Sequence, residues 1–485
     1  MKRRDFIRIT IGSIAAMGCG VSLAAPKESP KPNVVFILAD DLRADCIGAV
    51  NPLIKTPNID RLAKRGVLFN NCYNMGANGA GVCQPSRTMI MSGRHLYHLP
   101  NDSTAHSGDK PSVPVLPTVF RKAGYDSLFC GKTENTYPRA NNAFDQLAIR
   151  NIKHGEQDYD RAVRARRGYA KPVVSYLADP ARANKPFFAY YAPCTPHDPL
   201  FSEPECDKLY KGENRPPLPV SASVNHTAFA GFELKDTNAR PYDVPGLGRF
   251  KTPLNLSQWR DINAKYYAMV SSFDRDVGLI LDELERTGAI KNTIIVFSSD
   301  NGHSHSDHGQ IHKSSLYEHD IKLPLIVCGP GIAEGKRSDA FVYISDILPT
   351  LCEMIDTPIP ETVQTKSFLP NITDPGKSGR KTLSFGYTEE IRAFRDEQYK
   401  IVLYSNKYAQ LFDLKADPNE SRNLAKDPAF AKRLASMIEK ARAEDKAWGD
   451  CEDKKIANIW RPWPMKPCRL KKDGPMFWEI WADRK

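Results

Sequence analysis

The chain has 485 residues, of which 41% are hydrophobic and 26% are charged, a composition that excludes fibrous and disordered proteins. Beyond the N-terminus no apolar run approaches the roughly 20 residues of a membrane-spanning helix, so a polytopic membrane protein is excluded as well. The formal net charge is +11, without any block of five or more Lys and Arg. Scattered solvated charge is the simplest interpretation, although a mildly basic surface also suits an acidic polysaccharide. We predict no nucleic-acid partner.

The N-terminus is typical of an export signal. Lys2, Arg3 and Arg4 precede an apolar segment that is too short and too rich in small residues for a good membrane span. Ser22 and Ala24 suit a signal-peptidase cleavage site, and the Arg pair resembles a twin-arginine signal. We therefore expect a cleaved signal peptide, no stable membrane span and an exported protein, either periplasmic or extracellular.

Eleven cysteines are spread along the chain, and none forms a CxxC pair. This spacing gives no support to a structural zinc site or a thioredoxin-like site. Cys19 could instead carry a lipoprotein anchor, which is the alternative to ordinary cleavage. Cys130 and Cys328 lie in apolar runs and are expected to be buried free thiols, while the connectivity of any disulfides stays open.

Apolar, β-branched runs alternate with amphipathic segments after the N-terminus. In chain order, strands are predicted over residues 33–39, 127–130, 186–192, 292–298 and 324–328, and helices over residues 56–65, 118–123 and 258–287. This alternation indicates an α/β fold with a large, mostly parallel sheet sandwiched by helices. In such sheets, ligands bind beyond the carboxyl ends of the strands.

The pattern changes near residue 376. Short strands are predicted over residues 382–387, 392–404 and 409–414, and a helix over residues 428–447. They indicate a smaller α+β C-terminal subdomain. The chain is therefore divided into a signal peptide (1–25), a catalytic α/β domain (26–375) and the C-terminal subdomain with its tail (376–485).

Two segments lack a clear period. Residues 198–257 are rich in Pro, Gly and Asn, and we expect them to form an excursion at the rim of a substrate site. The tail, residues 451–485, holds four of the six Trp. A strap packed on the surface is the simplest interpretation of the tail, and carbohydrate stacking is the alternative.

Oxygen ligands follow two of the predicted strands. Asp40 and Asp41 come after the strand over residues 33–39, and Asp300 and Asn301 come after the strand over residues 292–298. Four oxygen donors at one edge of a sheet suit a hard cation such as Ca²⁺ or Mg²⁺. Helix capping and turn formation are the alternative role for such residues.

Cys83 lies in a different context from the other cysteines. It precedes Pro85, Ser86 and Arg87 at the predicted start of an apolar helix. A helix N-terminus stabilises anions and lowers the pKa of a thiol, and Arg87 one turn later can bind an anionic group. The segment therefore predicts an electropositive site with a nucleophile.

These motifs together resemble the type I, formylglycine-dependent sulfatases of the alkaline phosphatase superfamily, with the iduronate 2-sulfatase-like and choline-sulfatase-like branches nearest. The resemblance covers the whole mature chain. It is carried by Cys-x-Pro-Ser-Arg at residues 83–87 with Ser-Gly-Arg at 92–94, and by the segments 33–43, 56–63, 130–132, 196–199, 299–302 and 410–424. It implies the alkaline-phosphatase-like sulfatase fold.

The resemblance also implies the cofactors. Cys83 would be converted to formylglycine by a formylglycine-generating or sulfatase-maturating enzyme, and the hydrate of this group would be the nucleophile. One Ca²⁺ per chain would be held by the modified Cys83 and by four oxygen ligands. These ligands would be Asp40, Asp41, Asp300 and Asn301.

The remaining catalytic roles follow from the same resemblance. Arg87 would hold the formylglycine hydrate, and Lys132 and Lys313 would bind the sulfate oxygens. His197 would hydrogen-bond the sulfate or protonate the leaving oxygen. The family commonly has a histidine two or three residues after the lysine that Lys132 matches, and this chain has Glu and Asn at those places.

The expected function is hydrolysis of sulfate esters, with a sulfated poly- or oligosaccharide as the substrate. A small aryl or choline sulfate is the alternative substrate. The alternatives are a phosphomonoester or phosphonate hydrolase of the same superfamily, and a non-catalytic sulfated-glycan-binding protein with an unmodified Cys83. Residues 303–308 match the HxHxDH pattern of two-zinc hydrolases, but that fold needs further histidines downstream and the chain has none after His319. We instead expect residues 303–312 to form a loop over the sulfate site.

Overall fold

The computed structural model describes residues 31–79, 81–105, 110–149, 169–223, 242–244, 248–250, 255–310, 313–405 and 408–450. Residues 1–31 and 32–485 form separate units, and the fold below is that of the second. The expected signal peptide and the Trp-rich tail lie outside the described residues, so both stay predictions, as do the domain boundaries. Within the described part, no helix is long and apolar enough to cross a membrane.

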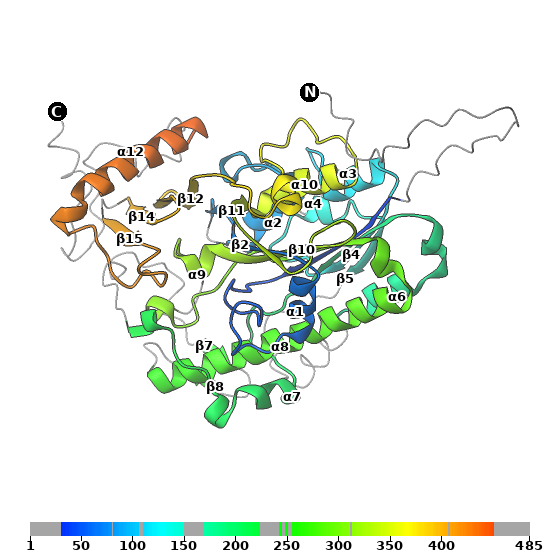
Figure 1. Ribbon diagram of the computed structural model, residues 1–485, viewed down its shortest axis with the longest axis horizontal. Helices are drawn as coiled ribbons and strands as arrows, with labels where there is room; N and C mark the ends of the chain where they lie inside the picture. The colour runs from blue at the N-terminus through cyan, green and yellow to red at the C-terminus, as the bar shows by residue number, and fades with distance from the viewer. Residues whose placement is uncertain are drawn as a thin grey trace, which may run out of the picture. The chain divides into compact units, whose positions relative to one another are not determined.

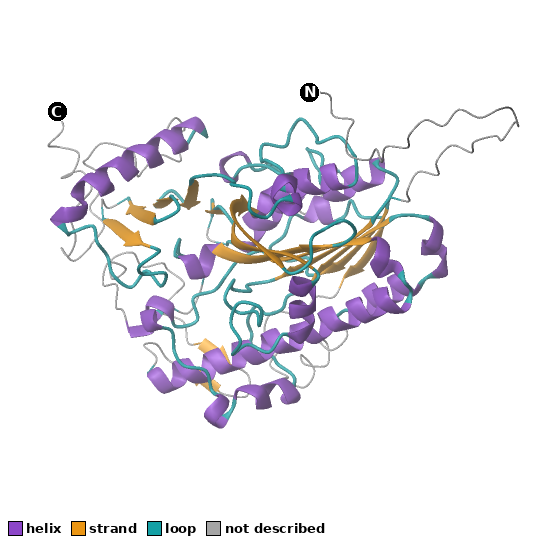
Figure 2. Ribbon diagram, viewed as in Figure 1, coloured by secondary structure: helices purple, strands orange, loops and turns teal. Residues whose placement is uncertain are grey.

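A mostly parallel sheet is the largest element of this unit (Figure 2). Among the described residues, its eight strands lie in the order β11-β2-β10-β9-β1-β6-β4-β5. Their bounds are β1 Asn33–Ala39, β2 Gly66–Tyr73, β4 Asp126–Gly131, β5 Gln146–Ile149, β6 Phe187–Ala192, β9 Thr293–Ser299, β10 Lys322–Cys328 and β11 Lys336–Tyr343. Strand β10 runs antiparallel to both of its neighbours, and the other pairs are parallel. The predicted fold class is confirmed, and β1 coincides with the predicted strand.

Helices cover both faces of this sheet (Figure 1). Successive side chains of a strand point to opposite faces. Val35 and Ile37 accordingly share a core with α1 (Pro57–Lys64), α6 (Lys171–Ala178) and α8 (Leu256–Arg286). Val34 and Phe36 pack into the core of the other face. The helices of that face are α2 Cys83–Ser92, α3 Leu116–Lys122, α4 Pro138–Asn141, α10 Ile347–Met354 and α11 Leu369–Thr373. Burial on both faces explains why β1 is apolar throughout.

A second sheet carries the C-terminal part of the chain. Its five strands, counted over the described residues, lie in the order β15-β14-β13-β12-β3. Their bounds are β3 Gly76–Ala77, β12 Leu383–Tyr387, β13 Ile391–Arg395, β14 Tyr399–Tyr404 and β15 Ala409–Asp413, and α12 (Ala431–Ala447) packs against this sheet. Strand β3 comes from the N-terminal half and pairs in parallel with β12, so the second sheet includes a segment that lies shortly before Cys83.

The single strand predicted over residues 392–404 is wrong in one respect, because the structure has two strands there. Asp396 accepts hydrogen bonds from the backbone N–H groups of Gln398 and Tyr399 at 2.9 and 2.7 Å. The side chain of an Asp can stabilise a turn in this way. The turn reverses the chain, and β13 and β14 then pair as antiparallel neighbours.

The remaining described elements are short. They are α7 Pro204–Asp207, α9 Glu318–Ile321, β7 Tyr242–Val244 and β8 Gly248–Phe250, with β7 and β8 paired antiparallel. The predicted rim excursion over residues 198–257 is described only in part, and its relation to substrate stays a prediction. Cys130 and Cys328 are buried free thiols, as expected.

A buried carboxylate joins α8 to the start of α1. Asp274, which is 1% exposed, accepts hydrogen bonds from the backbone N–H groups of Asn58 at 3.0 Å and Ile59 at 2.7 Å. These N–H groups have no partner inside α1, and a negative charge at a helix N-terminus is favourable. Burial nevertheless raises the pKa of Asp274 to about 6. The contact thus holds α1 against α8, although burial makes the carboxyl group of Asp274 harder to ionise.

This raised pKa predicts a pH-dependent contribution to stability. The folded protein binds this proton at a higher pH than the unfolded chain, so the contribution is complete below about pH 4 and is lost as the pH rises to about 6. We expect urea unfolding to show a fall of about 3 kcal/mol across this interval that Asp274→Asn lacks. Asp282→Asn, at an exposed site on the same helix, is the control and should follow the wild type. Parallel curves for wild type and Asp274→Asn would contradict the assignment.

Candidate active site

The acidic residues that follow β1 and β9 meet at one edge of the large sheet. These strands are parallel neighbours, and Ala39 pairs with Ser299 at their carboxyl ends. The backbone N–H of Asp41 donates to Asp300 Oδ1 at 3.1 Å, which joins the two chain ends directly. Asp40, Asp41, Asp300 and Asn301 are all fully buried. The structure thus brings together the four predicted oxygen ligands.

Cys83 reaches the same place from the first turn of α2. Its Sγ lies 3.4 Å from Asp40 Oδ1 and 3.8 Å from Asp41 Oδ1. Arg87 lies one turn later and is 2% exposed, with its Nε 2.7 Å from Asp300 Oδ2. A second guanidinium nitrogen, Nη2, lies 3.6 Å from Asp40 and has no hydrogen-bond partner among the described residues.

Two lysines complete the group of cations. Lys132, just after β4, forms an ion pair with Asp40, and Lys313 forms one with Asp41. The Nζ of Lys313 also lies 2.9 Å from Cys83 Sγ. Burial would lower the pKa of each lysine, but the neighbouring carboxylates raise it, so both lysines stay positively charged.

The two adjacent carboxyls differ in their electrostatic surroundings. Burial would raise the pKa of Asp40, but the positive charges of Lys132, His197 and Arg87 hold it well below its usual range. At Asp41 the effect of burial prevails over the attraction of Lys313, and the pKa rises to about 6. The positively charged side chains of the site therefore do not fully compensate the negative charge of its buried carboxylates.

The expected lowering of the thiol pKa is wrong. Burial raises the pKa of Cys83, and the nearby carboxylates of Asp300 and Asp40 add to this effect. Lys132 and Lys313 oppose the rise but do not reverse it. The helix N-terminus is outweighed because the thiol is 3% exposed and lies against acidic groups. An unmodified Cys83 is therefore a poor nucleophile in this position.

His197 lies close to the same carboxylates and to Cys83. It follows β6, and its Nε2 lies 3.7 Å from Asp41 Oδ2. Its Nδ1 lies 2.8 Å from the Oδ1 of Asp198, which orients the ring. Burial would lower the pKa of His197, but the carboxylates of Asp198 and Asp41 raise it well above its usual value. The ring is thus held in its protonated form next to the site.

The donor atoms fit a hard cation. Asp40, Asp41, Cys83 and Asp300 each offer a ligand atom, and these atoms lie within 4.8 Å of one another. Asn301 Oδ1 accepts a hydrogen bond from Asn74 at 3.1 Å, which orients the amide beside the carboxylates. Carboxylate and amide oxygens favour Ca²⁺ or Mg²⁺ over softer metals. Asn74 is a residue that the sequence analysis missed, because no pattern marks it as part of a site.

The histidines of residues 303–308 pack inward. His303, His305 and His308 are buried, and the rings of His303 and His305 stack at 3.8 Å. Their rings are therefore packed in the interior, while the expected place of residues 303–312 over the sulfate stays a prediction; His312 lies outside the described residues. Among the described residues, none of the groups that could hold a metal includes these histidines. Glu134 and Asn135 occupy the positions where the family commonly has a histidine after the lysine matched by Lys132, and both are exposed.

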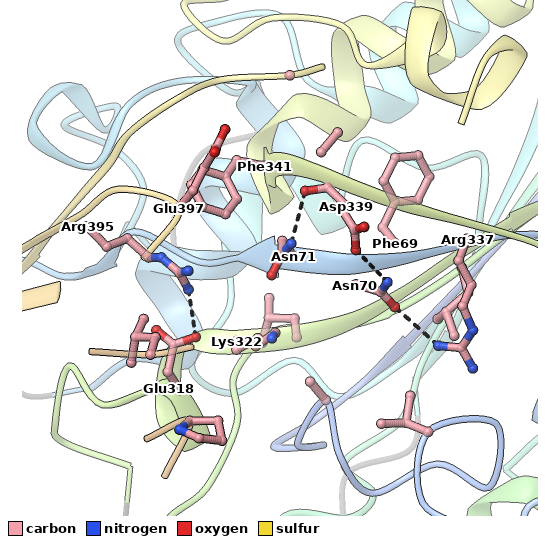
Figure 3. Close-up of a pocket in the computed structure, with 18 of the residues that line it drawn as sticks. Phe69, Asn70, Asn71, Glu318, Lys322, Arg337, Asp339, Phe341, Arg395 and Glu397 are labelled. Carbon is pink, nitrogen blue, oxygen red and sulfur yellow. Dashed lines mark hydrogen bonds and ion pairs between the residues drawn. The ribbon is translucent and has the colours of Figure 1, made fainter. Parts of the chain in front are cut away.

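A separate cavity of about 910 Å³ lies between the large sheet and the C-terminal sheet (Figure 3). Strands β2, β10 and β11 line one side, and residues of β13 and the loop after β15 line the other. Arg395 and Glu318 form an ion pair of 2.9 Å in its wall. None of the predicted site residues lines this cavity, so the candidate active site is the acidic edge described above.

Comparison with known proteins identifies the family. The sulfatase family model matches residues 32–357. The chain belongs to the sulfatase family. A second model, the C-terminal region of N-sulphoglucosamine sulphohydrolase, matches residues 306–446. The sequence-based prediction of a sulfatase of the formylglycine type is therefore confirmed, and the protein is an enzyme of this class.

Two curated relatives align with most of the sulfatase chain. It is 26% identical to an N-acetylglucosamine-6-O-sulfatase of Bacteroides thetaiotaomicron, over 87% of this chain and 88% of the relative. It is 27% identical to a Delta 4,5-hexuronate-2-O-sulfatase of the same bacterium, over 86% of this chain and 90% of the relative.

Solved structures share the fold. One is the structure of another protein bound to that protein's own substrate, D-glucosamine-2-N,6-O-disulfate (TM-score 0.73, 22% identity). The match covers 87% of this chain and 99% of that chain. Another is the phosphonate monoester hydrolase of Agrobacterium radiobacter (TM-score 0.70, 20% identity), with 88% of this chain and 97% of that chain covered.

The convergence of buried carboxylates predicts that the sulfatase is stabilised by calcium. A cation present at about 100 times its Kd adds about 2.7 kcal/mol to the free energy of unfolding. We expect Ca²⁺ to raise the Tm of chelator-treated protein by a few degrees, as measured by calorimetry. Asp300→Ala removes a ligand and should abolish the increase, whereas the exposed Asp282→Ala should keep it. A wild-type Tm that responds to neither Ca²⁺ nor Mg²⁺ would contradict a cation site.

Proposed function

We propose that this sulfatase releases sulfate from a sulfated carbohydrate of the glycosaminoglycan type, using a formylglycine made from Cys83 and one Ca²⁺. One observation carries the proposal. The Cys83 Sγ lies 3.4 Å from an oxygen of Asp40 and 2.9 Å from the Lys313 ammonium. A reactive group at this position is next to the oxygen ligands for a cation and also next to a positive charge that can bind a sulfate ester.

The two implied groups supply chemistry that the unmodified side chains lack. When hydrated, formylglycine supplies a hydroxyl nucleophile, which the thiol with its raised pKa does not. Ca²⁺ polarises sulfate oxygens when it is bound. The residues that would hold it are Asp40, Asp41, Asp300, Asn301 and the modified Cys83.

The chain's own cations bind and orient the sulfate. Lys132 and Lys313 are buried or nearly so and stay charged, so each can donate to a sulfate oxygen and offset negative charge that develops in the transition state. Arg87 is held by Asp300 and keeps one nitrogen without a hydrogen-bond partner in the described part of the chain. That nitrogen is available to hold the hydrate of residue 83.

His197 acts as the general acid for the leaving oxygen. Its Nδ1 faces the Oδ1 of Asp198, so Nε2 is the nitrogen that faces the site. A protonated ring at this place can give a proton to the sugar hydroxyl as it departs. His197 thereby covers the role of the histidine that the family has after the lysine matched by Lys132.

The substrate class rests on the relatives. The two curated relatives above are an N-acetylglucosamine-6-O-sulfatase and a Delta 4,5-hexuronate-2-O-sulfatase, both named for sulfated sugars. The mildly basic composition agrees with an acidic carbohydrate. A formylglycine-generating or sulfatase-maturating enzyme is the required partner, and the N-terminal signal indicates export to the periplasm or beyond.

A phosphonate ester hydrolase is the second candidate, because such an enzyme shares the fold at a TM-score of 0.70. A panel that compares glucosamine 6-sulfate, an unsaturated uronate 2-sulfate and a phenyl phosphonate monoester distinguishes the two. Faster turnover of the phosphonate than of every sulfate would favour this alternative.

Conversion of Cys83 to formylglycine predicts a defined change in mass. The tryptic peptide of residues 66–87, from protein made in a host with the maturation system, should be lighter than the unmodified peptide. The mass difference should be that between a cysteine side chain and an aldehyde. Cys72 lies in the same peptide and is buried in β2, so it provides an internal control. Fragment ions should place the change at Cys83 alone. An unmodified Cys83 from a competent host would favour the sulfated-glycan-binding alternative.

The role of His197 predicts that its importance depends on the leaving group. General acid catalysis contributes about 10²–10⁴-fold, and a nitrophenolate needs no proton to depart. His197→Ala should lower kcat on a sugar sulfate by at least about 100-fold, and by less than about tenfold on 4-nitrophenyl sulfate. His98→Ala, at a ring that contacts Gln364, is the control. Equal losses on both substrates would exclude the general-acid role.

A further inference from the structure

Tyr266 connects the long helix α8 to the turn that carries the acidic ligands. Its side chain is fully buried, and its hydroxyl donates a hydrogen bond of 2.6 Å to the backbone carbonyl of Asp41. The same hydroxyl accepts a hydrogen bond of 3.3 Å from the backbone N–H of Arg43. One side chain therefore holds both sides of the turn just after Asp41.

The backbone at this turn is strained. Asp41 has a φ of 70°, in the left-handed region that side chains other than glycine rarely adopt. Such a conformation costs of the order of 1–3 kcal/mol and persists only where the surroundings enforce it. In a continuing strand, successive side chains would point to opposite faces. Here the turn brings both Asp40 and Asp41 within 4 Å of the Cys83 Sγ.

Several hydrogen bonds hold the strained turn in place. The N–H of Asp41 donates to Asp300, and the N–H of Leu42 donates to Ser299 Oγ at 2.8 Å. Both acceptors belong to the end of β9 or lie just after it. Tyr266 is different, because it comes from a helix on one face of the sheet and bonds the carbonyl of Asp41 itself. Its ring is packed against His305 at 3.8 Å, which fixes the direction of the hydroxyl.

We propose that Tyr266 is a positioning residue for the cation site: it holds Asp41 in the left-handed conformation that directs two adjacent carboxylates to the same ion. The inference rests on the proposed calcium site. It assigns part of the affinity for calcium to a hydroxyl that touches neither the ion nor the substrate. Partners that orient metal ligands in this way typically change metal affinity by about 10–100-fold when they are removed.

Tyr266→Phe tests this inference because it removes one oxygen and keeps the ring and its packing. Chelator-treated protein is titrated with Ca²⁺ in a calorimeter, and the Kd of the variant should be about 10–100-fold higher than that of the wild type. The Ca²⁺ concentration that gives half-maximal sulfate release should rise by the same factor. At saturating Ca²⁺, kcat should return to near the wild-type value.

Tyr267→Phe is the matched control, since this neighbouring ring packs against Tyr210 and should leave the Kd unchanged. A merely structural role for Tyr266 would lower Tm equally with and without Ca²⁺, whereas a positioning role predicts a larger loss of Tm in the presence of Ca²⁺ than in its absence, because the variant gains less stability from the bound ion. A wild-type Kd in Tyr266→Phe overturns the inference and leaves the proposed function intact. Failure of the wild type itself to bind Ca²⁺ overturns both.

Discussion

Three carboxylates buried at the ends of two neighbouring strands are the constraint on which this structure depends. Charges without compensation in a protein interior cost several kcal/mol each. Asp300 is paired with Arg87, Asp40 with Lys132 and Asp41 with Lys313. Each partner comes from a different element, and the parallel order of β1 and β9 brings the acids together. The fold thus concentrates opposite charges in one largely buried place.

The C-terminal sheet contributes to this arrangement from a distance. Glu318 lies five residues after Lys313, and it pairs with Arg395 at 2.9 Å and with Lys400 at 3.1 Å, both from strands of that sheet. The backbone N–H of Glu318 donates to Glu420 at 2.7 Å. These buried contacts fix the segment that follows Lys313. The C-terminal part is therefore a structural support of the candidate active site.

The sequence predicts best what depends on neighbours along the chain. Strand β1 and the acids that follow it are readable because a run buried on both faces is apolar throughout and ends in polar residues. The sequence does not predict strand β2, because Asn70 and Asn71 interrupt its apolar run, and the side chains of both donate to Asp339 of the edge strand β11. The single strand expected over residues 392–404 was divided by the Asp396 turn.

What escapes sequence analysis depends on contacts between distant residues. The helix position of Cys83 by itself predicts an acidic thiol, yet the carboxylates around it come from residues far away in the chain. Tyr266 looks like an ordinary core residue of an amphipathic helix, and only the fold shows its hydroxyl against Asp41. Neither the balance between burial and charge nor a single long-range hydrogen bond produces a periodic pattern in the amino-acid sequence.

The pairing of β3 with β12 has a consequence for the order of events during synthesis. Gly76 and Ala77 lie just before Cys83, whereas their partners Gly386 and Tyr387 belong to the C-terminal sheet. At ribosomal rates, the roughly 300 intervening residues take on the order of tens of seconds to appear. Until then the second sheet cannot form, and the segment around Cys83 lacks its final covering. The maturation of Cys83 proposed above would therefore have that interval in which an enzyme can reach a side chain that is almost fully enclosed in the finished protein.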